Sequence, residues 1–79
     1  MPHASIKCLA GSSDAQKKAC AEAVAKVMSE KLGKPSRYVS VTVEEFSHDE
    51  WVEIYNKEIG GNKSNLLVEP GYTNPATFS

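Results

Sequence analysis

The opening residues, MPHAS, place a proline directly after the first methionine. If Met1 is removed, the nitrogen of Pro2 becomes a free secondary amine, which no other residue type can offer at a chain terminus. An unperturbed α-amino group has a pKa of about 7.7–8.0, so it can take and return a proton near neutral pH. Pro2 is therefore either a candidate general base or simply a neutral start to a strand.

Histidine and cysteine are the other residue types here that could bind a metal or act as a nucleophile. Two histidines and two cysteines without close spacing do not form a zinc-binding pattern, so we expect no metal site. Cys8 and Cys20 fall on predicted apolar faces, where we expect small buried hydrophobic side chains. His3 could tune the pKa of the neighbouring Pro2, but its ordinary interpretation is a solvated strand residue.

Two stretches have the side-chain pattern of β-strands. Residues 3–9 alternate between two faces, and residues 38–46 combine alternation with many β-branched and aromatic side chains. One face of each predicted strand carries small or apolar side chains, namely Ala4, Ile6 and Cys8 in the first and Val39, Val41 and Val43 in the second.

The stretch between these strands predicts a helix. Ser13 followed by Gln16 forms a capping box, and Gly33 with Pro35 ends the helix after about twenty residues. The apolar stripe of this helix consists of Ala19, Cys20, Ala23, Val24, Val27, Met28 and Leu32.

A second, shorter helix is predicted over residues 48–59. Ser47 and Glu50 form its capping box, and the glycine pair at 60–61 ends it. We expect the tail, residues 72–79, to be irregular or to pair with a neighbouring chain.

The order strand, helix, strand predicts a β-α-β unit with two parallel strands and a right-handed crossover helix. The fold class is therefore α+β, with a single domain over residues 1–79. Such a two-stranded sheet leaves one face and both edges exposed, and a chain this short is marginal on its own. We expect oligomerisation to complete the fold.

The charge and hydropathy of the chain exclude several classes of partner. The net charge is −1 and the pI is about 6.1, which gives no basic surface for nucleic acid or an anionic membrane. No apolar stretch approaches the length that spans a bilayer, and no basic stretch precedes an apolar one. We therefore expect a cytoplasmic protein without a signal peptide.

The chain resembles the 4-oxalocrotonate tautomerase family. The features that carry the resemblance are Pro2, the first strand, the segment GSSDAQK and the crossover to a second strand. The resemblance covers nearly the whole chain. The segment SHDEWVEIYNKEI and the later EPGY are most similar to a subgroup of small bacterial tautomerases of the phenylpyruvate type. The resemblance implies an isomerase that moves a proton between carbon and oxygen, with Pro2 as its general base and with no cofactor.

The same resemblance implies where substrate would bind. Ser12 and Ser40 stand where founding members carry arginines, and Trp51 stands where they carry a pocket phenylalanine. A serine hydroxyl cannot form the bidentate contact that arginine makes with a carboxylate. We therefore expect a small 2-oxo acid such as an arylpyruvate rather than a dicarboxylate, with Arg37 or Lys7 as a possible source of positive charge. Trp51 could equally be an ordinary core or interface residue.

Other interpretations remain open at this point. Self-association as a homodimer fits the subgroup, and a hexamer fits the founding members. The loss of both arginines also suits a non-catalytic, oligomeric small-molecule binding module on the same scaffold. A third possibility is addition of water to a halogenated acrylate, for which Glu44 or Glu53 could supply the water-activating carboxylate.

Overall fold

A computed structural model describes residues 1–74 of the chain. Its contacts divide the chain after Glu45 into two compact units. A single domain over residues 1–79 stays a prediction. Residues 75–79, the end of the tail that we expect to be irregular or paired with a neighbour, lie outside the described residues.

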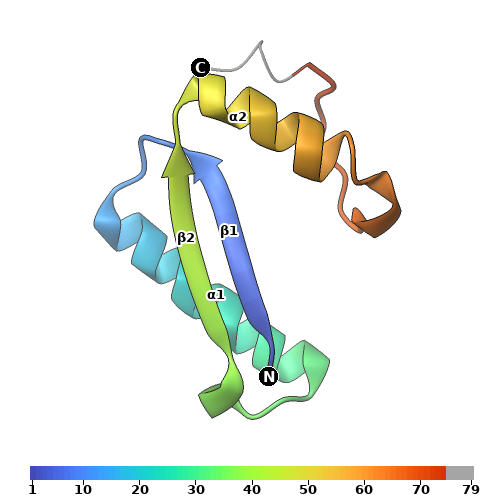
Figure 1. Ribbon diagram of the computed structural model, residues 1–79. Helices are drawn as coiled ribbons and strands as arrows, with labels where there is room; N and C mark the ends of the chain where they lie inside the picture. Colours follow the sequence, from blue (N-terminus) through green and yellow to red (C-terminus); the bar gives the residue numbers. More distant parts are fainter. Residues whose placement is uncertain (75–79) are drawn as a thin grey trace. The chain divides into compact units, whose positions relative to one another are not determined.

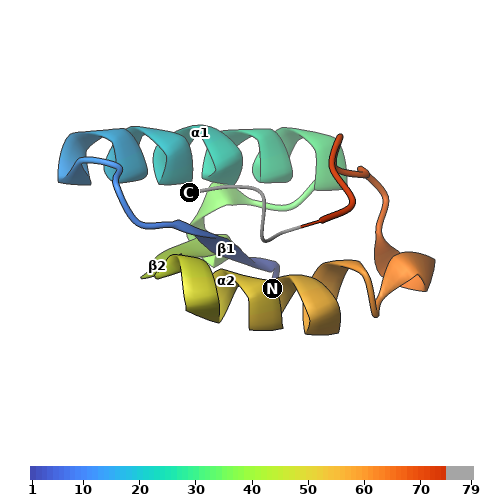
Figure 2. The ribbon, with the colours of Figure 1, turned by 90° about the horizontal axis from the view of Figure 1, so that it is seen from above.

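The first unit has the β-α-β arrangement that the sequence predicts (Figure 1). Strand β1 spans His3–Leu9 and strand β2 spans Ser40–Phe46, and the two run parallel, side by side, in a two-stranded sheet. Helix α1, Asp14–Leu32, connects them and covers one face of this sheet, as Figure 2 shows from above. The crossover is right-handed in Figure 1, which is the usual hand for parallel strands joined by a helix.

The second strand begins two residues later than predicted. Residues Ser36–Tyr38 form a short 3₁₀ turn, η1, closed by hydrogen bonds from the N–H of Tyr38 to the carbonyl of Pro35 and from Val39 to Ser36. These bonds hold Tyr38 and Val39 in the turn, although their side chains favour a strand. The turn therefore fixes Ser40 as the first residue of β2.

Both predicted ends of α1 are confirmed. The Ser13 side chain accepts from the N–H of Gln16, and the Gln16 side chain accepts from the N–H of Ser13, which completes the capping box. Gly33 ends the helix with φ 66°, a left-handed conformation that glycine adopts without strain.

The face of α1 that packs on the sheet is only partly the predicted apolar stripe. Val24 and Met28 are half-buried as predicted, but the other half-buried positions are Lys17, Ala21, Ala25 and Ser29. Five members of the predicted stripe are exposed in the single chain, namely Ala19, Cys20, Ala23, Val27 and Leu32. The prediction of a buried Cys20 is therefore wrong for the single chain, whereas Cys8 is half-buried.

The second unit begins with helix α2, His48–Ile54, which continues into a π-helical turn, η2, Tyr55–Ile59. The Ser47–Glu50 capping box is confirmed, as is the end of the helix at the glycine pair. A Cβ on Gly61 would clash with the carbonyl oxygen of Asn56, so only glycine fits there. A short 3₁₀ turn, η3, follows at Lys63–Asn65. Neither helix of the described chain combines the length and the apolar character that crossing a bilayer requires.

Candidate active site

Pro2 lies immediately before β1 and is half-buried. Its carbonyl accepts a hydrogen bond from the N–H of Ser40, the first residue of β2, at 3.2 Å. Because parallel strands start at the same edge of a sheet, the fold brings these two predicted site residues together.

The hydroxyl of Ser40 has a close partner in the residue that follows Pro2. The Ser40 Oγ lies 2.7 Å from Nδ1 of His3, and Nε2 of the same ring makes a longer contact of 3.5 Å with the hydroxyl of Thr42. All three side chains are exposed. His3 is thus a strand residue at the surface, as its ordinary interpretation predicts, but its ring contacts the hydroxyl that was singled out as a substrate donor.

A guanidinium group lies on the turn that leads into β2. The Cζ of Arg37 lies 4.6 Å from the centre of the Tyr38 ring, and its Nη2 donates to the Tyr38 hydroxyl at 3.1 Å. Two contacts to one side chain restrict where the guanidinium can move. Lys7, the other candidate cation, donates to the hydroxyl of Ser5 within β1 at 3.4 Å.

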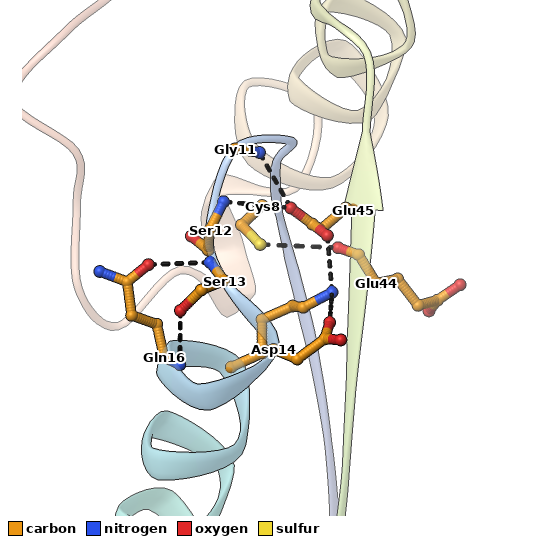
Figure 3. Close-up of polar contacts among 9 residues, drawn as sticks. Cys8, Gly11, Ser12, Ser13, Asp14, Gln16, Glu44 and Glu45 are labelled. Atoms are coloured by element: carbon orange, nitrogen blue, oxygen red, sulfur yellow. Dashed lines mark hydrogen bonds and ion pairs between the residues drawn. The ribbon is translucent and has the colours of Figure 1, made fainter.

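Ser12 lies in the loop between β1 and α1, where a carboxylate from β2 binds two backbone amides (Figure 3). The N–H of Gly11 and the N–H of Ser12 both donate to Oε2 of Glu45, at 3.0 Å and 3.3 Å. Gly11 has φ 129°, a conformation that glycine adopts far more readily than other residues. The turn that presents the two amides therefore depends on a glycine at this position.

The second oxygen of the same carboxylate contacts Lys17 of α1. The Lys17 Nζ lies 2.7 Å from Oε1 of Glu45 and 3.2 Å from Asp14, and the side chains of Lys17 and Glu45 are 26% and 23% exposed. The hydrogen bond from Lys17, followed by the amide of Gly11, lowers the pKa of Glu45. The hydrogen bonds to Glu45 and Asp14 raise the pKa of Lys17. Lys17 and Glu45 are therefore both charged at neutral pH and form an ion pair.

The sequence reasoning missed Glu45, although the pattern of β2 contained a signal for it. Val41 and Val43 lie on the half-buried side of the strand, and Glu45 is the next residue with the same parity. A carboxylate that continues a buried face needs a partner, which α1 supplies as Lys17. Glu44, a candidate water-activating carboxylate, is exposed, and its side chain makes a long 3.5 Å contact with the hydroxyl of Ser5.

The two predicted serines lie at opposite ends of the sheet. Ser40 begins β2 beside Pro2, whereas Ser12 follows the far end of β1. A strand rises about 3.3 Å per residue, so the seven residues of β1 separate these ends by about 20 Å. One chain therefore does not bring Ser12 and Pro2 to the same small substrate.

Trp51 belongs to an aromatic cluster in the second unit. Its Nε1 donates to the hydroxyl of Tyr72 at 3.1 Å, and the Tyr72 ring packs against Tyr55 with centroids 5.4 Å apart. Tyr55 and Tyr72 line a pocket of about 100 Å³ together with Lys63 and Glu69, among others, but Trp51 is not one of its lining residues. This pocket lies wholly within the second unit. A role for Trp51 as a wall of the substrate pocket therefore stays a prediction.

The described residues hold no grouping of three His, Cys, Asp or Glu side chains that could bind a metal ion. The polar groups beside Pro2, namely the Ser40 hydroxyl and the His3 imidazole, are suited to hydrogen bonding and proton transfer.

Comparison with known proteins places this geometry in a family. The family described as "Tautomerase enzyme" matches residues 2–54. The chain belongs to the tautomerase family. Tautomerase PptA of Klebsiella pneumoniae is 32% identical over 74 residues, which cover 92% of this chain and 99% of that protein. A probable tautomerase of Xylella fastidiosa is 36% identical over 73 residues, covering 91% of this chain and 89% of its own length.

Solved structures extend the same relationship to the fold of this tautomerase. The 4-oxalocrotonate tautomerase homologue TomN of the tomaymycin biosynthetic pathway has a TM-score of 0.60 and is 34% identical, covering 63% of this chain and 77% of its own. YwhB, another homologue of 4-oxalocrotonate tautomerase, has a TM-score of 0.59 at 31% identity, over 61% of this chain and 79% of its own. The predicted family, fold class and isomerase activity of tautomerase type are thereby confirmed.

Proposed function

We propose that this tautomerase catalyses keto–enol proton transfer on a small 2-oxo acid such as an arylpyruvate, with Pro2 as the general base once Met1 has been removed. The observation that most supports this proposal is the position of Pro2. It is half-buried, its backbone is fixed to the start of β2, and the match to the family begins at this residue.

The chemistry requires one group that can accept a proton and give it back. The terminal secondary amine takes the proton from the enol hydroxyl or from the carbon next to the carbonyl, and it returns that proton to the other atom. No atoms are gained or lost overall, so the step needs no co-reactant. Burial in an apolar pocket would disfavour the charged amine, so we expect the amine of Pro2 to titrate below a free terminus.

The neighbouring polar groups fit a substrate with one carboxylate and one enol oxygen. The guanidinium of Arg37, held against Tyr38, would bind the carboxylate. The Ser40 hydroxyl, beside Pro2 and in contact with His3, would donate to the enolate oxygen as negative charge develops there. Ser40 begins β2 beside Pro2, and Arg37 lies in the turn that leads into the same strand.

Self-association is part of the proposal, because Ser12 lies about 20 Å from Pro2 within one chain. A second copy would bring its own Ser12 to the Pro2 end, and a homodimer is the smallest assembly that does so. The exposed apolar side chains of α1 also favour association, since Val27 and Leu32 are 52% and 56% exposed. A cytoplasmic location completes the proposal.

The test is the pH–rate profile for conversion of the enol of phenylpyruvate to the keto form, using protein whose mass shows that Met1 is absent. We expect a rate well above buffer that rises with pH through a single pKa below that of a free α-amine, because only the neutral amine is a base. Binding of phenylpyruvate without turnover at any pH would instead identify a binding module and overturn the proposal.

A further inference from the structure

The loop that carries Ser12 has a carboxylate of its own bound to it. The amides of Gly11 and Ser12 point at one oxygen of Glu45 (Figure 3). Lys17 binds the other oxygen at 2.7 Å. Two backbone N–H groups just before a helix, with a lysine beside them, are the donors that usually bind the carboxylate or phosphate of a ligand. In this protein the anion is supplied by β2.

The charges of this cluster also oppose a second anion. Lys17 contributes one positive charge, while Glu45 and Asp14, both in contact with it, contribute two negative charges. A ligand carboxylate arriving at Ser12 would meet a net negative cluster, with both amides already donating. The Ser12 hydroxyl could still donate to a neutral part of a ligand.

From this arrangement we infer that Glu45 determines substrate specificity, by disfavouring a second carboxylate at the Ser12 end of the site. This inference rests on the proposed function, in which Ser12 contacts the substrate. Glu45 acts through its negative charge, which binds the two amides and Lys17 tightly and repels a second anion, and it does not touch the reacting atoms. The enzyme would then accept 2-oxo acids whose far end is aromatic or apolar and discriminate against dicarboxylates of similar size.

The variant Glu45→Gln tests this inference because it removes the charge while keeping the size of the side chain. The readout is the inhibition constant of two unreactive acids, trans,trans-muconate with two carboxylates and cinnamate with one, against the phenylpyruvate reaction. Charge-assisted hydrogen bonds at a partly exposed site predict that the variant binds muconate about tenfold more tightly, while its affinity for cinnamate stays the same.

Glu44→Gln is the matched control. Glu44 is the adjacent carboxylate of β2, but its side chain is exposed and contacts Ser5 of β1 rather than the Ser12 loop, so the same loss of charge there should leave both inhibition constants nearly unchanged. An unchanged muconate-to-cinnamate ratio in Glu45→Gln, or an equal change in Glu44→Gln, would overturn the inference. Circular dichroism would establish that both variants are folded.

A wild-type protein without turnover would refute the proposed function, and the specificity inference would then be decided by binding alone. The amide resonances of Gly11 and Ser12 would be followed by ¹⁵N nuclear magnetic resonance while muconate or cinnamate is added. We expect muconate to shift both amides in Glu45→Gln and to leave them in place in the wild type. Equal shifts in the two proteins would contradict a role for Glu45 in excluding the anion.

Discussion

The backbone N–H of Ser40 donates to the carbonyl of Pro2 at 3.2 Å. This bond lies at the edge where both strands begin, so the residue with the candidate base and the residue with the candidate donor are fixed by backbone geometry rather than by flexible side chains. The His3 ring, 2.7 Å from the Ser40 hydroxyl, adds a side-chain contact to the same place.

Moving or changing the terminal amine should remove most of the activity. In Pro2→Ala the terminus carries a primary amine with a less restricted position, and loss of a positioned general base usually costs about 10²–10⁴-fold in rate. We expect kcat for phenylpyruvate to fall within that range. A glycine inserted between Met1 and Pro2 is the companion variant, because it keeps the proline but converts its nitrogen to an amide. Retention of most of the rate in the glycine-insertion protein would exclude Pro2 as the base, and retention in Pro2→Ala would show that the proline ring is not required.

Arg37 should act on substrate binding more than on the chemical step. Its guanidinium is held by Tyr38 at the turn before β2, and a carboxylate bound there is present in both the ground state and the transition state. We expect Arg37→Gln to raise KM about tenfold with kcat nearly unchanged, and Arg37→Lys to lie between that variant and the wild type. Steady-state kinetics with phenylpyruvate separates the two parameters. A fall in kcat at constant KM would contradict the assignment of Arg37 to the carboxylate.

The Lys17–Glu45 pair should make stability depend on pH at both ends of the scale. The pKa of Glu45 is lowered in the folded state, chiefly by its hydrogen bond with Lys17, so its contribution is present above the unfolded value near 4.5 and is lost as pH falls through the folded pKa. The pKa of Lys17 is raised, so its contribution is complete below the unfolded value near 10.5 and is lost as pH rises through the folded pKa.

Urea unfolding of wild type and Glu45→Gln at several pH values measures this dependence. We expect the difference in the free energy of unfolding to be constant near neutral pH and to shrink in acid below the ordinary carboxyl range. Glu44→Gln serves as the control, and its difference from wild type should stay small throughout. A difference between wild type and Glu45→Gln that persists undiminished at low pH would show that the carboxylate charge is not what matters.

The elements that position these groups could be predicted from local signals. The helix ends depend on interactions within a few residues, so the sequence reveals them directly. These local signals are the two capping boxes, the left-handed Gly33 and the glycine pair after α2. The start of β2 could not be placed as well, because the turn at Ser36–Tyr38 overrides the strand preference of Tyr38 and Val39. The role of Glu45 was missed for a different reason. Its partner Lys17 is 28 residues away in the chain, and only the crossover of α1 over the sheet brings the two together.

The separation of Ser12 from Pro2 leads to the last prediction, which concerns two chains at once. If each site combines Pro2 of one chain with Ser12 of its partner, an inactive Pro2→Ala protein and a weakened Ser12→Val protein should complement each other. Half of the dimers in an equal, randomly exchanged mixture are mixed, and each mixed dimer has one site with both residues intact. Unfolding and refolding the mixture should therefore restore about a quarter of the wild-type activity, since the interface of a two-fold dimer is used twice. Activity equal to the average of the two parents would contradict a shared site and assign Ser12 to another role.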